Sequence, residues 1–149
     1  MRAVIQRVKS ASVAIEGKRT AHIGQGLLIL LGVSGQDSSK QAEFLAGKVA
    51  NLRIFSDEND KMNLSLLDVG GQALVVSNFT LYGDCSHGRR PSYQSAGAPS
   101  MAQPLYEEFV DWLRKNKVQN VFTGEFGADM LVELQNDGPV TLILDTDQM

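Results

Sequence analysis

One stretch of the sequence places hydroxyl groups and an amide at the end of an apolar run. The strand expected from Ala73 to Leu81 turns polar where Ser77, Asn78 and Thr80 surround Phe79. Polar groups at the exit of a buried strand can contact a substrate, and a threonine hydroxyl is a potential nucleophile. The same pattern also suits a strand whose polar residues face a neighbouring strand. The pattern alone leaves both interpretations open.

A second candidate is a pair of guanidinium groups, Arg89 and Arg90, in a loop rich in glycine, serine and proline. The loop runs from Gly83 to Pro99, which is longer than most structural connections. Paired arginines are suited to contacting phosphate. Exposed loops also carry solvated arginines without a ligand. The sequence therefore permits either a phosphate contact or a solvated surface.

The third candidate is Asn136 to Thr141, which contains Gly138-Pro139 between two apolar runs, Leu131–Leu134 and Val140–Leu144. Asn-Asp-Gly between two such runs predicts a hairpin turn. Pro139 has no N–H group for a strand ladder, so it belongs at a strand start, an edge or a bulge. The alternative is that Gly138-Pro139 presents rigid backbone carbonyls to a ligand. Local sequence does not decide between the two.

Other catalytic motifs are missing from the chain. There is no nucleophile elbow, P-loop or dinucleotide fingerprint. Cys85 and His87 are two residues apart on one loop and rarely aim at each other there. With His22 they supply only three ligands without zinc spacing, and Asp84 is either a general base or a solvated carboxylate. We expect no metal and no cofactor.

Bulk properties limit the class of protein. The chain has 149 residues, 43% of them hydrophobic and 21% charged, which predicts one globular domain over residues 1–149. The run Leu27–Leu31 is too short to span a bilayer, and a single cysteine fits the reducing cytoplasm. A net charge of −3 gives no overall signature of a nucleic-acid binder. Any RNA contact has to be local, for example through Arg2, Arg89 and Arg90.

Hydrophobic periodicity predicts the elements that hold these candidates. We expect four strands as an antiparallel meander in the first 33 residues, at 1–8, 11–16, 20–23 and 27–33. A helix should follow a capping box from Ser38 to Gln41, and a second helix should begin near Pro104. The predicted fold is α+β: a largely antiparallel, barrel-like sheet with two helices packed on it, closed by a C-terminal β-hairpin.

Several stretches are similar to signatures of one family, the D-aminoacyl-tRNA deacylases. Met1–Val8 is similar to the family's opening, Ser77–Leu81 resembles its Ser-Gln-Phe-Thr-Leu signature, and Asn136–Thr141 matches Asn-x-Gly-Pro-Val-Thr in full. The segments Arg90–Ser92, Gly124–Met130 and 55–63 fit as well. The resemblance covers essentially the whole chain. The chain departs from the family pattern at Asn78, where the family usually has glutamine. Asparagine keeps the amide but shortens its reach by one methylene.

The resemblance implies an activity and a set of site residues. The enzyme would hydrolyse the ester of D-aminoacyl-tRNA, and of glycyl-tRNA mischarged on tRNA(Ala), as chiral proofreading during translation. It would be a cytoplasmic homodimer with its active sites at the subunit interface, binding the acceptor end of tRNA. A cis Gly138-Pro139 of one subunit, braced by Arg7, would reject L-amino acids in the other subunit. The remaining residues implied are Ser77, Asn78, Phe79 and Thr80 along the reacting wall, with Ala102, Phe126 and Met130 around the terminal adenosine.

The resemblance also bears on the chemistry. Backbone N–H groups of Phe79 and Thr80 are expected to bind the ester carbonyl oxygen. No base is placed beside Thr80 by the sequence, so the preferred mechanism has the 2′-hydroxyl of the terminal ribose assisting attack by water. Two other functions stay open: an inactive dimeric ligand-binding or interaction module on the same scaffold, and a generic hydrolase of small esters.

Overall fold

The computed structural model describes residues 1–149. Its sheet is built around the first strand, which pairs with three others. Strand β1 (Arg2–Ile15) pairs antiparallel with β2 (Lys18–Ile23), β3 (Gly26–Gly32) and β8 (Leu131–Asp145). The two strands expected at 1–8 and 11–16 are therefore one. Lys9 and Ser10 stay extended because β8 continues alongside them, with a register shift between Val8 and Ser10.

The remaining strands of this sheet run parallel to their neighbours. Strand β6 (Gln72–Ser77) pairs with β3, and β7 (Val121–Thr123) pairs with β6, which gives the order β2-β1-β3-β6-β7. Strand β3 is buried on both faces, as its unbroken apolar run predicted. A small separate hairpin joins β4 (Phe55–Ser56) to β5 (Met62–Leu64). The α+β class and the barrel-like sheet are confirmed, and the sheet is mixed rather than purely antiparallel.

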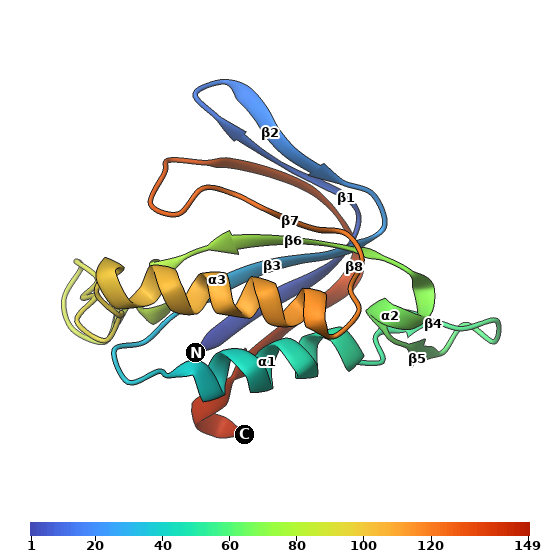
Figure 1. Cartoon of the computed structure of the whole chain (residues 1–149). Helices are drawn as coiled ribbons and strands as arrows, with labels where there is room; N and C mark the ends of the chain where they lie inside the picture. Colours follow the sequence, from blue (N-terminus) through green and yellow to red (C-terminus); the bar gives the residue numbers. More distant parts are fainter.

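Helices α1 (Ser39–Asn51) and α3 (Pro99–Lys115) lie side by side across one face of the sheet (Figure 1). The main core of 27 buried residues lies where these helices meet the sheet. The predicted capping box of α1 is present, since Ser38 and Gln41 bond each other's backbone. Helix α3 begins at Pro99, five residues before the predicted start, because Pro99 already occupies the first turn and Pro104 is tolerated inside the helix.

Shorter helices complete the structure. Helix α2 (Leu66–Val69) is a single turn that the sequence did not predict, so there are three α-helices rather than two. Two 3₁₀ turns, η1 (Phe79–Tyr82) and η2 (Thr146–Gln148), follow β6 and β8. No helix is both long enough and apolar enough to cross a membrane.

The C-terminal segment is one strand and not the predicted hairpin. Gln6 of β1 pairs with Thr141 and Val8 pairs with Asn136, so a single residue, Arg7, lies opposite Asp137–Val140. The Asn-Asp-Gly-Pro sequence therefore forms a bulge within β8 (hereafter the Gly-Pro bulge, residues 137–140) instead of reversing the chain. The hairpin prediction was wrong because β1 is long enough to pair with both halves of β8.

Candidate active site

A cleft of 740 Å³ opens at the end of β6. It is bounded by β3 and β6, Gln6 of β1, the loop before α3, the first turn of α3, the segment that leads into β8 and the first residues of β8. Thirteen of its twenty lining residues are hydrophobic, and Asp129 is the only aspartate, glutamate, lysine, arginine or histidine among them. An apolar cleft with few polar groups is suited to binding an organic ligand rather than a highly charged one.

The predicted reacting wall forms one edge of this cleft. Ser77, Asn78 and Phe79 line it, and the Phe79 ring is 56% exposed. The chain leaves β6 with the Asn78 N–H donating to the Leu31 carbonyl at 2.8 Å, and then turns into η1. Gly32 permits this close approach, since a Cβ there would lie 3.1 Å from the Asn78 carbonyl oxygen.

The Asn78 side chain bends back onto Thr80. Its Oδ1 accepts the Thr80 N–H at 3.2 Å and the Thr80 hydroxyl at 2.5 Å. This arrangement caps the first turn of η1. The Thr80 N–H, which the sequence led us to expect at the ester carbonyl oxygen, is bonded to the Asn78 side chain in this structure. Thr80 itself is exposed and lies just outside the cleft lining.

Arg7 holds the Gly-Pro bulge from beneath. Its side chain is buried, with the residue 8% exposed, and its Nη1 donates to the Ile54 carbonyl at 2.7 Å. Its Nε lies 3.1 Å from both the carbonyl oxygen and the carboxylate Oδ2 of Asp137. Asn136 fastens the other side, since its Nδ2 donates to the carbonyls of Arg7 and Val140 at 2.9 and 3.1 Å. The bulge is therefore fixed to the sheet at both ends.

Gly138 and Pro139 form the outer part of this bulge. The peptide bond between them is cis and both residues are exposed. Neither residue lines the cleft of its own chain, and neither does Arg7. The cleft lining thus reaches Gln6, which bonds Thr141 beside the bulge, but does not include Gly138 or Pro139 of the same chain.

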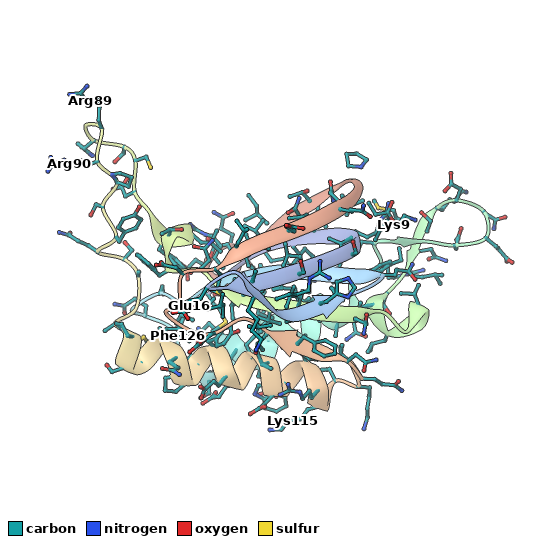
Figure 2. The ribbon with its side chains drawn as sticks, turned by 90° about the horizontal axis from the view of Figure 1, so that it is seen from above. Lys9, Glu16, Arg89, Arg90, Lys115 and Phe126 are labelled. Atoms are coloured by element: carbon teal, nitrogen blue, oxygen red, sulfur yellow. The ribbon has the colours of Figure 1, made fainter.

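The three residues expected around a terminal adenosine do meet in the cleft. Ala102 comes from α3, and Phe126 and Met130 come from the segment before β8. Figure 2 shows Phe126 beside α3, and its ring lies 5.9 Å from that of Tyr106. The Tyr106 hydroxyl donates to the Val75 carbonyl at 2.9 Å, and burial raises the pKa of Tyr106 to about 12. Tyr106 is therefore a neutral donor that ties α3 to β6 behind the cleft.

Arg89 and Arg90 lie at the tip of the long loop, well away from the helices (Figure 2). An antiparallel bridge between Asp84 and Ser92 closes the base of the loop, with bonds of 2.7 and 2.9 Å. His87 contacts Ser86 and not Cys85. Hydrogen bonds from Ser86 hold the pKa of Asp84 below its usual range, which makes Asp84 a weak base. None of these residues lines the cleft.

Arg2 has an internal structural role that the sequence did not indicate. Its guanidinium donates to the Leu81 carbonyl at 2.6 Å and pairs with Asp145 at 2.8 Å. It also lies 4.6 Å from the centre of the Tyr82 ring, whose pKa burial raises. Burial opposes ionisation of Asp145, but bonds from the Asp147 N–H and Arg2 lower its pKa overall. Arg2 therefore anchors η1, while Arg89 and Arg90 keep their side chains free for a ligand.

Sequence reasoning missed three polar residues of the cleft: Gln6, Tyr93 and Asp129. The Gln6 Nε2 donates to the Thr141 hydroxyl at 3.1 Å, beside the Gly-Pro bulge. Tyr93 meets Phe79 edge to face, with ring centres 5.2 Å apart. No local signal marks Tyr93 or Asp129.

Comparison with known proteins places these features in context. The profile of the family described as D-Tyr-tRNA(Tyr) deacylase matches residues 4–145. The D-aminoacyl-tRNA deacylases of Thermosipho africanus and Clostridioides difficile are 60% and 56% identical over 146 residues, covering 98% of this chain and 97% of theirs.

Two solved structures are similar as well. The c-Myc DNA Unwinding Element Binding Protein is 40% identical, with a TM-score of 0.92 over 98% of this chain and 99% of that protein. A probable eukaryotic D-amino acid tRNA deacylase has a TM-score of 0.83 at 17% identity, covering 96% of this chain and 97% of the other, and supports the fold alone.

Proposed function

The chain belongs to the D-Tyr-tRNA(Tyr) deacylase family, and on this premise we propose that it hydrolyses the ester bond of D-aminoacyl-tRNA. The products are free tRNA and the D-amino acid. The apolar cleft edged by Ser77, Asn78 and Phe79 carries this proposal, because it offers an organic acyl group and a nucleobase a common site. The Phe79 N–H then binds the ester carbonyl oxygen. The reaction takes place in the cytoplasm, where aminoacyl-tRNA is used for translation.

The active unit is a homodimer. Strand β8 pairs with β1 along one edge only, and it exposes a row of apolar side chains that includes Leu131 at 67% and Ile143 at 71%. An open edge with exposed apolar residues favours pairing with another chain. A second copy seated here carries the Gly-Pro bulge to the partner's cleft. The absence of Gly138 and Pro139 from the cleft lining of their own chain supports this arrangement.

Replacing Ile143 with lysine is expected to weaken the dimer by about 100-fold or more, because a charge is then buried in an apolar contact. Hydrolysis of D-tyrosyl-tRNA should fall in parallel with the dimer fraction. Sedimentation measurements and initial rates over a range of protein concentrations test both effects. Phe44→Lys is the matched control, since Phe44 is 50% exposed on α1 and not on β8. A monomeric Ile143→Lys protein with full activity would contradict the composite site.

Chirality is selected by exclusion. The carbonyl oxygens of the Gly-Pro bulge stand beside the α-carbon of the substrate in the partner's cleft, where an L side chain would collide with them and a D side chain points away. Arg7 and Asn136 hold that bulge in place. Because glycine has no side chain to exclude, glycyl-tRNA, including glycine mischarged on tRNA(Ala), is hydrolysed too.

The 2′-hydroxyl of the terminal ribose assists attack by water, and Thr80 is not the nucleophile. No histidine, lysine or carboxylate bonds the Thr80 hydroxyl, which instead donates to an amide. Thr80→Val should therefore reduce kcat by about tenfold at most, the effect of one lost hydrogen bond. Single-turnover hydrolysis of D-tyrosyl-tRNA measures this. A loss of several thousandfold in a correctly folded variant would restore Thr80 as the nucleophile.

The contact with tRNA is local and responds to salt. The tip of the loop with Arg89 and Arg90 is the available basic feature, and a net charge of −3 provides no broad attraction. Binding through two guanidinium groups to phosphates carries little sequence preference. This suits an enzyme that must accept many tRNAs at their acceptor ends.

One assay separates the proposed function from the alternatives. We expect hydrolysis of D-tyrosyl-tRNA, with little hydrolysis of the ethyl ester of D-tyrosine and none of L-tyrosyl-tRNA. Rapid cleavage of the free ester would identify a general esterase. A stable dimer that cleaves none of these substrates would identify a binding module that kept the scaffold without its activity.

A further inference from the structure

The orientation of the Asn78 amide is determined by the backbone. The Thr80 N–H can only donate, so the Asn78 atom that it meets at 3.2 Å is the oxygen and not the nitrogen. The Thr80 hydroxyl lies 2.5 Å from the same oxygen. Because that oxygen has no proton to give, the hydroxyl must be the donor in this bond as well.

This bond sets the polarity of the Thr80 hydroxyl. Its single proton is directed to Asn78, so its oxygen presents only lone pairs to the surroundings. A carboxamide is too weak a base to remove that proton, and Asn78 therefore cannot activate Thr80 for attack. The hydroxyl is left as an exposed hydrogen-bond acceptor one residue beyond Phe79 of the cleft lining.

Backbone bonds hold the turn that carries Thr80 in addition to the Asn78 cap. Backbone bonds join Asn78 N–H to Leu31 at 2.8 Å and Gly83 N–H to the Thr80 carbonyl at 2.9 Å. Arg2 binds the Leu81 carbonyl from the other side. Removing the Asn78 amide is thus expected to release the hydroxyl to rotate while the backbone of η1 keeps its place.

We propose that Asn78 is a positioning residue that fixes the Thr80 hydroxyl as an acceptor for a donor of the reacting complex. That donor is an N–H of the substrate's α-ammonium group or an O–H of the attacking water. The inference rests on the proposed deacylase function and explains the asparagine at this position. A glutamine side chain is one methylene longer. Its oxygen would extend past the position from which the Asn78 oxygen accepts both the N–H and the hydroxyl of Thr80.

A double-mutant cycle tests the proposal with wild type, Asn78→Ala, Thr80→Val and the double variant. Each single variant should lower kcat for D-tyrosyl-tRNA by about three- to tenfold with little change in KM. The double variant should lose no more than the worse single one, because both changes remove the same oriented hydroxyl. Asn78→Asp keeps an acceptor of the same length and should recover most of the loss in kcat. Its added charge should raise KM only.

Two further measurements separate positioning from a merely structural role. Amide exchange at Thr80 should accelerate in Asn78→Ala while exchange at Gly83 is unchanged, since only the former bond is lost. The 3-(4-hydroxyphenyl)propionyl ester of tRNA has no α-nitrogen, so the penalty of Thr80→Val should vanish on it if the ammonium is the donor and persist if water is.

The outcomes that overturn the inference are distinct from a failure of the proposed function. If wild type does not cleave D-tyrosyl-tRNA, the deacylase function itself fails. If wild type is active but the two losses multiply, or if Asn78→Asp is as impaired in kcat as Asn78→Ala, then Asn78 does not act through Thr80.

Discussion

Replacing Pro139 with alanine is expected to make the enzyme hydrolyse L-tyrosyl-tRNA at least about 100-fold faster than the wild type does, while hydrolysis of D-tyrosyl-tRNA falls less than tenfold. The proline ring fixes φ and removes a backbone donor, which keeps the exposed end of the bulge rigid. Alanine lets that segment move, so its carbonyl oxygens can shift away from an L side chain. The reacting wall at Ser77 to Phe79 belongs to a different part of the chain and is left intact.

The measurement is the ratio of initial rates on D- and L-tyrosyl-tRNA for purified dimers of both proteins. Pro104→Ala is a matched control, because Pro104 is also exposed but lies in α3, away from the bulge and the cleft lining. Its D/L ratio should equal that of the wild type. A dimeric Pro139→Ala enzyme that still rejects the L substrate would show that selection resides elsewhere in the cleft.

The parts of this site that sequence reasoning could find are those with a local physical signature. The apolar run from Ala73 indicated a buried strand, although that strand ends at Ser77 and not at the predicted Leu81, and the spacing of Ser38 and Gln41 indicated a helix start. Both signals depend on interactions within a few residues. The resemblance to deacylases then directed attention to Arg7, which no local pattern would have distinguished from a solvated arginine.

The parts that could not be found depend on pairing between distant segments. Asn-Asp-Gly has the composition of a hairpin turn, and only the length of β1 makes it a bulge, since both halves of β8 find a partner on the same strand. The cleft combines Gln6, Tyr93 and Asp129 from three separate regions. The bond from Thr80 to Asn78 could not be predicted, because the sequence identifies the amide but not the direction in which its side chain turns.

Replacing Arg7 with alanine is expected to lower the free energy of unfolding by about 3 kcal/mol and to abolish discrimination between D and L substrates. The guanidinium is buried and serves both the Ile54 carbonyl and the main chain and carboxylate of Asp137. Its removal leaves both carbonyls without a charged donor, and the Asp137 carboxylate keeps only Lys9, at 3.9 Å. The same contacts hold the Gly-Pro bulge, so stability and selectivity should be lost together.

Urea denaturation gives the change in stability, and the D/L rate ratio measured well below the denaturation midpoint gives the change in selectivity. Arg19→Ala removes an exposed arginine of β2. It should change the free energy of unfolding by no more than about 0.5 kcal/mol, and the D/L rate ratio by no more than the corresponding factor. Arg7→Lys should be intermediate, because an ammonium group is a point donor that cannot serve Ile54 and Asp137 with the geometry of a guanidinium. If Arg7→Ala were destabilised by the expected amount yet kept full rejection of L-tyrosyl-tRNA, Arg7 would support the sheet alone. The rigidity of the bulge would then have to come from Asn136 and the proline ring.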